Sequence, residues 1–363
     1  MKHIAVLLWT VFIVSTGSAQ LLQPGFSRNE YLDMLRVTAR QVDTPWTNVK
    51  VPAPHNYSFV YRSNIVGLDN MWDLWVHKTD KVAVLSLRGT TANPESWLEN
   101  FYAAMVPAQG TLQLDNKRIF PYKLASNPKA AVHIGWLLGM AFLSDDILSK
   151  TDSLYKKGYK DFIIMGHSQG GALAYMFRSY MYYLQQDGKL PKDMRMKTYN
   201  SAAPKPGNLY YAYDYEHINY GGWAYTVVNA DDWVPETPLS LQTIADFNTV
   251  NPFTNAGEML SKQPFPKNVV LKLVYNNLRR PAAKLLKRYQ RYLGDEAYKM
   301  VKKQLNEYRH PALYNSNNYM RAGSPVVLTG NDVYRKEYPD KEDQVFIHHF
   351  PEPYYYLAGQ LPE

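Results

Sequence analysis

The residue type and spacing that point most directly to chemistry occur in Gly166-His167-Ser168-Gln169-Gly170. A serine with glycine two positions away on each side is typical of a nucleophile elbow, a tight turn that exposes the hydroxyl between a strand and a helix. The context fits, because the short, mainly apolar run 161–165 precedes the turn and a helical pattern over about 169–186 follows it. The alternative is a glycine-rich helix start with an idle serine. We expect Ser168 to be a nucleophile that takes an acyl group.

A serine hydroxyl attacks efficiently only when a base removes its proton and a carboxylate orients that base. Hydrolases with this elbow supply the partners in the chain order Ser, Asp, His. The nine histidines show no H-E-x-x-H or other metal spacing, and the chain has no glycine loop of the phosphate or dinucleotide type. His133 and His217 are interpreted as structural hydrogen-bonding residues. We therefore expect catalysis with no metal and no cofactor.

The surrounding pattern predicts the elements that would position this serine. Strand-like runs lie at 58–61, 72–77, 82–87, 161–165, 194–199, 224–229 and 325–328, and helical stretches at about 94–105, 135–155 and 169–186. Strands that alternate with helices imply a mostly parallel sheet with helices on both faces. A helical, basic segment at about 244–310 is interpreted as an insertion that precedes the C-terminal segment. We expect a single α/β domain over residues 20–363.

Five motifs resemble those of the class 3 lipases, a family of the α/β-hydrolase type, and they follow one another along the chain in the family's order. They are the elbow with Gly171-Ala172-Leu173-Ala174, Leu87-Arg88-Gly89-Thr90-Thr91, Val132-His133-Ile134-Gly135-Trp136, Ser201-Ala202-Ala203-Pro204-Lys205-Pro206-Gly207-Asn208, and Asn229-Ala230-Asp231-Asp232-Trp233-Val234-Pro235. The resemblance covers roughly residues 50–240 and 319–357. Ala202 stands where the family usually has glycine. The resemblance implies an α/β-hydrolase-like fold and the hydrolysis of carboxylic esters.

The resemblance also implies roles for individual residues. Asp232 matches the acid of the family, with Asp231 as the alternative, since a slip by one residue changes which carboxylate points inward. The histidines beyond Asp232 are His310, His348 and His349. His310 lies in the insertion, whereas the other two precede an aromatic segment like the one that follows the family's histidine. We expect His349 to be the base and keep His348 as the alternative.

Two further features follow from the same resemblance. The backbone N–H groups of Gln169 and Thr90 are the expected oxyanion donors, with help from the Thr90 hydroxyl, while Arg88 is expected to be structural. The segment 93–109 lies where the family has a lid. The sequence leaves two alternatives for this segment, a mobile apolar lid and a fixed, buried helix.

The N-terminus predicts export. Lys2, the apolar run 4–14 and the small residues Gly17-Ser18-Ala19 form a secretory signal, and the apolar run is too short to span a hydrocarbon core of about 30 Å. We expect removal of residues 1–19 and a periplasmic or extracellular protein. The chain has no cysteine, which excludes disulfides and thiolate sites.

The net charge of +8 is concentrated in one block. Twelve Lys and Arg residues lie between Lys262 and Lys303, opposed there by Asp295 and Glu296 only. The apolar stripe Leu285, Leu286, Tyr289 and Leu293 would suit transient contact with an anionic membrane or lipid interface. The alternative is that this stripe packs on the core. No nucleic-acid-binding module accompanies the charge, so we expect no nucleic-acid partner.

Together these patterns predict a carboxylic ester hydrolase of lipase type that cleaves acyl glycerols or related lipid esters through an acyl group on Ser168. A phospholipase or an acyltransferase with the same three residues is an alternative. So is a non-catalytic, membrane-associated binding protein that keeps the fold.

Overall fold

The computed structural model describes residues 22–42, 49–253 and 256–362 of the chain. The expected signal segment 1–19 lies outside the described residues. Helix α1 (Arg28–Thr38) comes first along the described chain, and α10 (Pro351–Ala358) comes last. Within the described part, no helix is both long and apolar enough to cross a membrane.

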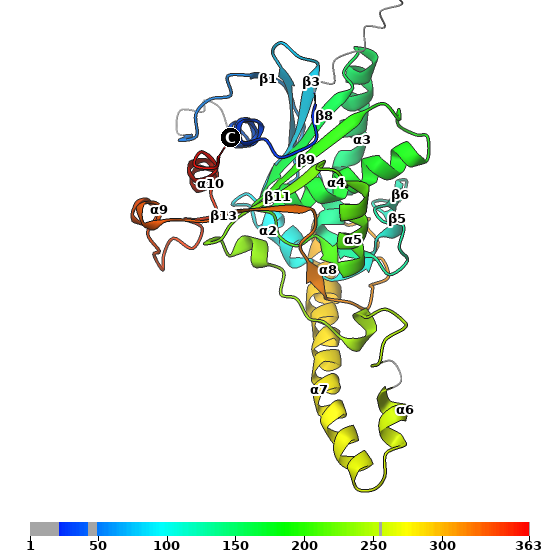
Figure 1. The fold of residues 1–363 in the computed structure, drawn as a ribbon. Coiled ribbons are helices and arrows are strands. Elements are labelled where there is room, and N and C mark those ends of the chain that lie inside the picture. Colours follow the sequence, from blue (N-terminus) through cyan, green and yellow to red (C-terminus); the bar gives the residue numbers. More distant parts are fainter. Residues whose placement is uncertain (1–21, 43–48, 254–255, 363) are drawn as a thin grey trace, which may run out of the picture.

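A mixed sheet of seven strands forms the centre of the molecule (Figure 1). Its order is β1 (Tyr57–Arg62), β2 (Trp72–His77), β3 (Val82–Leu87), β8 (Asp161–His167), β9 (Arg195–Ser201), β11 (Ala224–Asn229) and β13 (Ser324–Leu328). Strands β1, β2 and β3 pair antiparallel, whereas β3, β8, β9, β11 and β13 are parallel to one another. The expected mostly parallel α/β sheet is confirmed.

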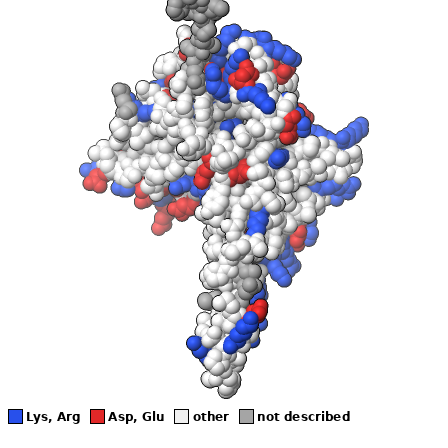
Figure 2. Space-filling model, turned by 45° about the vertical axis from the view of Figure 1, so that its right-hand side comes forward, with Lys and Arg blue, Asp and Glu red and all other residues white. Residues whose placement is uncertain are grey.

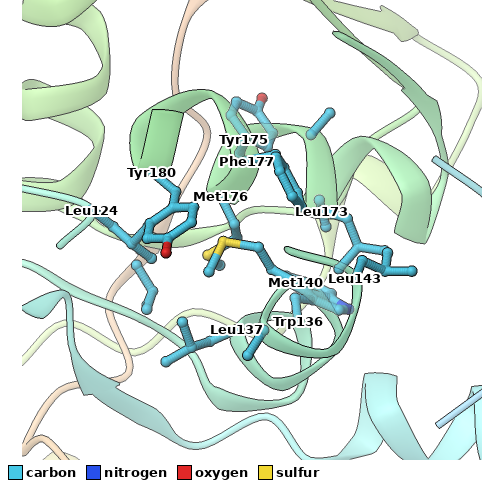
Figure 3. Close-up of a cluster of buried hydrophobic side chains, with 14 of the residues drawn as sticks. Leu124, Trp136, Leu137, Met140, Leu143, Leu173, Tyr175, Met176, Phe177 and Tyr180 are labelled. Atoms are coloured by element: carbon cyan, nitrogen blue, oxygen red, sulfur yellow. The ribbon is translucent and has the colours of Figure 1, made fainter. Parts of the chain in front are cut away.

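Both faces of this sheet are buried, because alternate residues of its strands enter two different hydrophobic clusters. Ala83 and Leu85 of β3 join the cluster under α3 (Ile134–Lys156) and α4 (Gln169–Gln186). Val82 and Val84 join the cluster that contains residues of α1 and α10. Helices therefore cover both faces, as the sequence predicts. Figure 3 shows part of the first cluster, where Leu137 and Met140 of α3 lie near Met176 of α4.

Short elements beside the sheet differ from the sequence-based expectation. The predicted helix 94–105 ends earlier: α2 spans Pro94–Phe101, and residues Met105–Pro107 form strand β4. This strand belongs to a small sheet with β7 (Ala131–His133), β10 (Gly207–Asn208) and β12 (Tyr319–Met320). A hairpin of β5 (Gln109–Gln113) and β6 (Ile119–Lys123), and helices α5 (Leu209–Ile218) and α9 (Asp332–Glu337), complete the body.

The segment between β11 and β13 leaves the body as an arm (Figure 1). It contains α6 (Ala256–Ser261) and α7 (Lys267–Gln290), and η4 (Arg291–Glu296) and α8 (Ala297–Gln304) return to the body. Strands β11 and β13 are nevertheless direct neighbours in the sheet, with Val227 opposite Val326. The helical segment therefore lies outside an uninterrupted sheet.

Candidate active site

The serine of the elbow stands in a strained backbone conformation. Ser168 has φ 61° and ψ −131°, between the last residue of β8 and the first residue of α4. Such angles are rare for a residue with a Cβ and are kept only where the surroundings enforce them. The turn presents Ser168 at the N-terminus of α4, where the helix dipole favours negative charge.

The glycines of the motif are required by close backbone contacts. A Cβ on Gly166 would lie 2.0 Å from the carbonyl oxygen of Gly170, and one on Gly170 would lie 2.2 Å from that of Leu87. Gly89 also lies close to the elbow, because a Cβ on this residue would lie 2.8 Å from the carbonyl oxygen of His167. These contacts bring the segment after β3 directly against the elbow.

The structure joins Asp232 and His349, although 116 residues separate them in the chain, by a 2.8 Å hydrogen bond from His349 Nδ1 to Asp232 Oδ2. The hydroxyl of Tyr354 donates to the same oxygen at 2.8 Å, and the Val234 N–H donates to Oδ1 at 3.0 Å. Burial by itself would raise the pKa of the Asp232 carboxyl, but the hydrogen bonds and positive charge facing it outweigh burial and lower that pKa. Asp232 is therefore a carboxylate suited to orient an imidazole.

His167, the neighbour of Ser168, holds the backbone of His349. Its Nε2 lies 2.6 Å from the carbonyl oxygen of His349, and its Nδ1 lies 3.0 Å from Ser201 Oγ. A carbonyl oxygen can only accept, so Nε2 carries the proton and Nδ1 accepts from the serine hydroxyl. Burial and the nearby His349 lower the pKa of His167 to about 3, which keeps this ring neutral. The ring centroids of His167 and His349 are 5.2 Å apart, which places the expected base beside the elbow.

The alternative residues have other partners. Asp231 faces Arg335 at 3.3 Å. His348 contacts the Tyr334 hydroxyl at 2.7 Å through Nδ1 and Asp340 at 2.9 Å through Nε2.

His310 is also committed elsewhere. It contacts the Tyr102 hydroxyl at 2.8 Å and Asp295 at 3.2 Å. Of the candidate acid and base residues, the described structure brings together Asp232 and His349. It records no hydrogen bond between the Ser168 hydroxyl and His349 in this state, a contact that often tightens only when substrate binds.

The expected oxyanion donors lie side by side. Gln169 is the first residue of α4, so its N–H has no acceptor within the helix. The Thr90 hydroxyl donates to Gln169 Oε1 at 2.8 Å and accepts from Asn100 Nδ2 at 2.9 Å. Its one proton is thus engaged, which removes the hydroxyl from the donors expected for the oxyanion. The backbone N–H groups of Thr90 and Gln169 remain the candidates.

A buried carboxyl group that the sequence analysis missed supports these donors. Glu99 of α2 accepts from Gln169 Nε2 at 2.8 Å through Oε1 and from Asn70 Nδ2 through Oε2. Its side chain is fully buried, and burial raises its pKa to about 8. Gly139 of α3 leaves the room for this contact, because a Cβ there would lie 2.5 Å from Glu99 Oε1. In the sequence, Glu99 has only the pattern of a polar residue on an amphipathic helix.

Asn100, the next residue of α2, is fixed from the other side. Its side-chain oxygen accepts from Trp136 Nε1 at 2.9 Å, and its carbonyl oxygen accepts from His133 Nε2 at 3.2 Å. The His133 ring stacks on Trp136 at 3.6 Å between centroids, and burial lowers the pKa of His133 to about 3. The expected structural role of His133 agrees with these contacts. Arg88 likewise pairs with Asp69 at 3.0 Å.

Helix α2 is held in place in this state of the molecule. Ser96, Leu98 and Glu99 are buried, and the N–H of Ala104 donates to the carbonyl oxygen of Leu293 at 3.0 Å. These contacts match the fixed helix, one of the two alternatives for segment 93–109.

Aromatic side chains from three segments form a connected group beside His349. Phe346 lies 5.9 Å from the His349 ring, 5.4 Å from Trp233 and 6.0 Å from Trp97 of α2. Phe101 is 6.4 Å from Trp97 and is 59% exposed. We call Trp97, Phe101, Trp233 and Phe346 the aromatic rim. A partly exposed apolar rim beside a candidate catalytic histidine suits an apolar ligand.

No group of three or more His, Asp or Glu side chains able to hold a metal is found within residues 22–42, 49–253 and 256–362. Catalysis without a metal or cofactor stays a prediction.

Comparison with known proteins confirms the family resemblance. Residues 84–242 match the model of the family Lipase (class 3), and all five motifs lie within this range. The match supports an ester hydrolase that acts on lipids. No curated protein matches the chain.

Several solved fungal lipases resemble the chain at low identity. The native lipase–propeptide complex of Rhizomucor miehei is 18% identical, with a TM-score of 0.42, over 60% of this chain and 65% of that one. Lip2 lipase from Yarrowia lipolytica is 18% identical, with a TM-score of 0.43, over 58% and 74%. A triacylglycerol lipase from Penicillium expansum is 15% identical, with a TM-score of 0.43, over 58% and 72%.

Proposed function

We propose, with the match of residues 84–242 to the class 3 lipases as the premise, that this chain hydrolyses carboxylic esters of lipids through an acyl group on Ser168. The observation that carries the proposal is the hydrogen bond between Asp232 and His349 beside the strained Ser168 turn. A serine in an elbow, an oriented imidazole and a buried carboxylate are the parts that acyl transfer to serine requires.

In the proposed reaction, His349 takes the Ser168 hydroxyl proton while the serine oxygen attacks the ester carbonyl carbon. Asp232 orients the imidazole and stabilises its protonated form. The N–H groups of Thr90 and Gln169 donate to the oxyanion, a contribution of about 2.7–4 kcal/mol for one such donor. The protonated imidazole then gives its proton to the departing alcohol.

The acyl group leaves by the same steps with water as the nucleophile. His349 removes a proton from water, the hydroxide attacks the acyl carbonyl, and the Ser168 oxygen regains the proton as the carboxylic acid departs. The apolar residues of the aromatic rim support an acyl chain as the ligand that lies beside His349. Acyl glycerols are the substrates that we expect first, with phospholipids as the alternative head group.

The test is hydrolysis of p-nitrophenyl esters with short and long acyl chains by the wild-type protein and by Ser168→Ala. Activity that disappears in the variant, together with covalent labelling of the wild type alone by a fluorophosphonate probe, supports the proposal. A wild-type protein that neither hydrolyses the esters nor reacts with the probe contradicts it and favours a non-catalytic binding protein. Product analysis with a competing alcohol separates hydrolysis from acyl transfer.

We also propose that the protein is exported and cleaved after Ala19. The proposal comes from the charged start, apolar run and small residues of segment 1–19. Mass spectrometry of the protein recovered outside the cytoplasm should show an N-terminus at Gln20. An intact Met1 on the recovered protein would contradict cleavage.

A further inference from the structure

The arm, defined here as residues 256–290, projects away from the body as a helical hairpin (Figure 1). Its long helix α7 has 24 residues, which correspond to about 36 Å at the usual rise per residue. The arm carries eight Lys and Arg residues and a single carboxylate, Glu258, for a net charge of +7. Most of the excess positive charge of the chain is therefore on this one projection.

Large apolar side chains gather toward the far end of the arm. The following six are each more than half exposed: Met259, Phe265, Val269, Val270, Leu273 and Val274. Soluble monomers rarely leave so many neighbouring apolar groups in water unless the surface binds something. The patch differs from the stripe expected from the sequence, because Leu286 of that stripe is buried and Tyr289 and Leu293 are partly buried.

The helical repeat of α7 puts apolar and basic groups on one face at different heights. Val269, Val270, Leu273 and Val274 are spaced by one and four residues and therefore form a stripe along one side. At 100° per residue, Arg280, Lys284, Lys287 and Arg288 fall on the same side, two to five turns toward the body. Figure 2 shows the arm with a broad uncharged surface and with Lys and Arg along its edges.

The base of the arm adds a basic groove. An open groove of about 1010 Å³ separates α7 from the segment 242–253 of the body. Its described lining has five basic residues and no carboxylate; the basic residues are Lys129, Arg279, Arg280, Lys284 and Lys287. Within the described residues, Lys262 forms the arm's ion pair, with Glu258 at 2.7 Å, and no carboxylate pairs with the other seven arm cations.

We propose that the arm is a docking surface for an anionic phospholipid surface, with its apolar tip entering the interface and its cations contacting the head-group phosphates. An apolar stripe next to uncompensated cations is the pattern of helices that lie in such interfaces. Charge complementarity selects an anionic over a zwitterionic surface. Binding of a nucleic-acid backbone requires cations alone, so it would not explain the exposed valines, leucine and phenylalanine.

Docking through the arm also brings the candidate site to the lipid. Helix α8, at the base of the arm, packs against α2, and η4 accepts the hydrogen bond from Ala104 just beyond α2. The aromatic rim residues Trp97 and Phe101 belong to that same helix. This consequence rests on the proposed function, whereas the docking itself does not.

The test measures vesicle binding by the full-length protein with Ser168→Ala, so that hydrolysis cannot alter the membrane. The protein is sedimented with vesicles of phosphatidylcholine alone and with vesicles that contain about 30% phosphatidylglycerol, at low and high salt. We expect binding to the anionic vesicles at low salt and its loss at high salt. Equal binding to both vesicle types, or no binding to either, overturns the proposal.

Charge variants locate the surface. Replacing three arm cations (Arg280→Gln, Lys284→Gln, Lys287→Gln) should weaken binding on the order of a hundredfold, at about fivefold for each basic residue. The matched control removes three exposed lysines of the body (Lys78→Gln, Lys157→Gln, Lys192→Gln). If both triple variants lose affinity equally, the arm is not the docking surface.

A single cysteine reports insertion of the tip. The chain has no cysteine, so Leu273→Cys gives one position for an environment-sensitive fluorophore. Anionic vesicles should shift its emission to the blue, while the same label at Lys157→Cys on the body should not respond. If the label at position 273 still reports an aqueous environment when the protein is bound to vesicles, the tip does not insert and this part of the proposal is overturned. Because none of these readouts uses activity, a failed hydrolase proposal would leave them unchanged.

Discussion

At the scale of single residues, the Asp232 carboxylate has the most specific surroundings, because three donors converge on it. Asp232→Asn keeps the size of the side chain but favours the wrong tautomer of His349. We expect kcat to fall by about 10⁴-fold with an unchanged fold. Steady-state kinetics and circular dichroism of the variant check this.

The matched control for that change is the adjacent carboxylate. Asp231 pairs with Arg335 near the surface, and Asp231→Asn should leave kcat within about twofold, because exposed pairs contribute little. An equal loss of kcat in both variants would contradict Asp232 as the orienting residue and return Asp231 to consideration.

Ala202 is the second residue with a testable local consequence. It has φ 49°, a left-handed conformation that costs a residue with a Cβ about 1–2 kcal/mol. Ala202→Gly removes this cost but adds about 0.5–1 kcal/mol of chain entropy, so we expect the free energy of unfolding to rise by up to about 1.5 kcal/mol. Chemical denaturation measures the change.

Ala203→Gly serves as the control, because Ala203 is also buried but its φ is not positive. It should lower the free energy of unfolding by about 0.5–1 kcal/mol. A similar loss in both variants would show that the conformation of Ala202 carries no strain.

At the scale of elements, α2 contains a buried acid whose protonation is linked to stability. The pKa of Glu99 is raised to about 8, above its ordinary value. At a pH between the ordinary pKa and the raised pKa, Glu99 loses its proton in the unfolded chain but keeps it in the native state. Native stability therefore falls as the pH rises. This one group contributes a slope of roughly 1.4 kcal/mol per pH unit. The contribution of Glu99 to native stability is fully present below the ordinary pKa of glutamate, and it is lost as the pH rises toward the raised pKa.

Glu99→Gln imitates the protonated acid and should flatten the decline in unfolding free energy between about pH 5 and pH 8. Denaturation of the wild type and the variant across that range makes the measurement. The control is Glu95→Gln on the same helix, where the carboxylate is only partly buried and accepts from Gln304. Glu99→Gln that tracks the wild type at every pH would contradict a neutral Glu99.

The sequence predicts long elements better than short ones, for a physical reason. Helix α4 has the predicted bounds, because its apolar residues repeat over five turns and the elbow marks its start. Strand β4, by contrast, was not predicted, and the expected helix 94–105 overlaps it only at Met105. Its three residues are too few to show a period, and their backbone groups pair with β7, a partner remote in the chain.

The candidate site shows the same division. Ser168 lies in a motif that local spacing reveals. The choices of Asp232 and His349 came from the family resemblance, with Asp231 and His348 left as alternatives. Glu99 was missed, because its burial depends on the approach of α3 at Gly139 and on a hydrogen bond from Gln169, both of which are tertiary. Local pattern and resemblance therefore indicate the candidate catalytic residues, while the residues that support them emerge only from packing.

At the scale of the whole molecule, the charge is divided between a nearly neutral body and an arm of net charge +7 in a chain of net charge +8. A soluble ester reaches the site by diffusion, whereas a lipid in an anionic vesicle is reached after docking of the arm. Salt screens the docking step far more than it affects a neutral soluble ester, because the screening length shortens from roughly 14 Å at about 50 mM to roughly 4 Å at about 500 mM.

We therefore expect hydrolysis of an ester lipid held in phosphatidylglycerol vesicles to fall at least tenfold over that range of salt, with hydrolysis of p-nitrophenyl acetate changing less than about twofold. In the variant with Arg280→Gln, Lys284→Gln and Lys287→Gln, the vesicle rate at low salt should already be low and should depend little on salt, while the soluble ester is cleaved as by the wild type. Initial rates on both substrates across the salt series supply the data. A vesicle rate with the same salt dependence in the wild type and the variant would mean that the arm does not bring the site to its lipid, even if the serine mechanism holds.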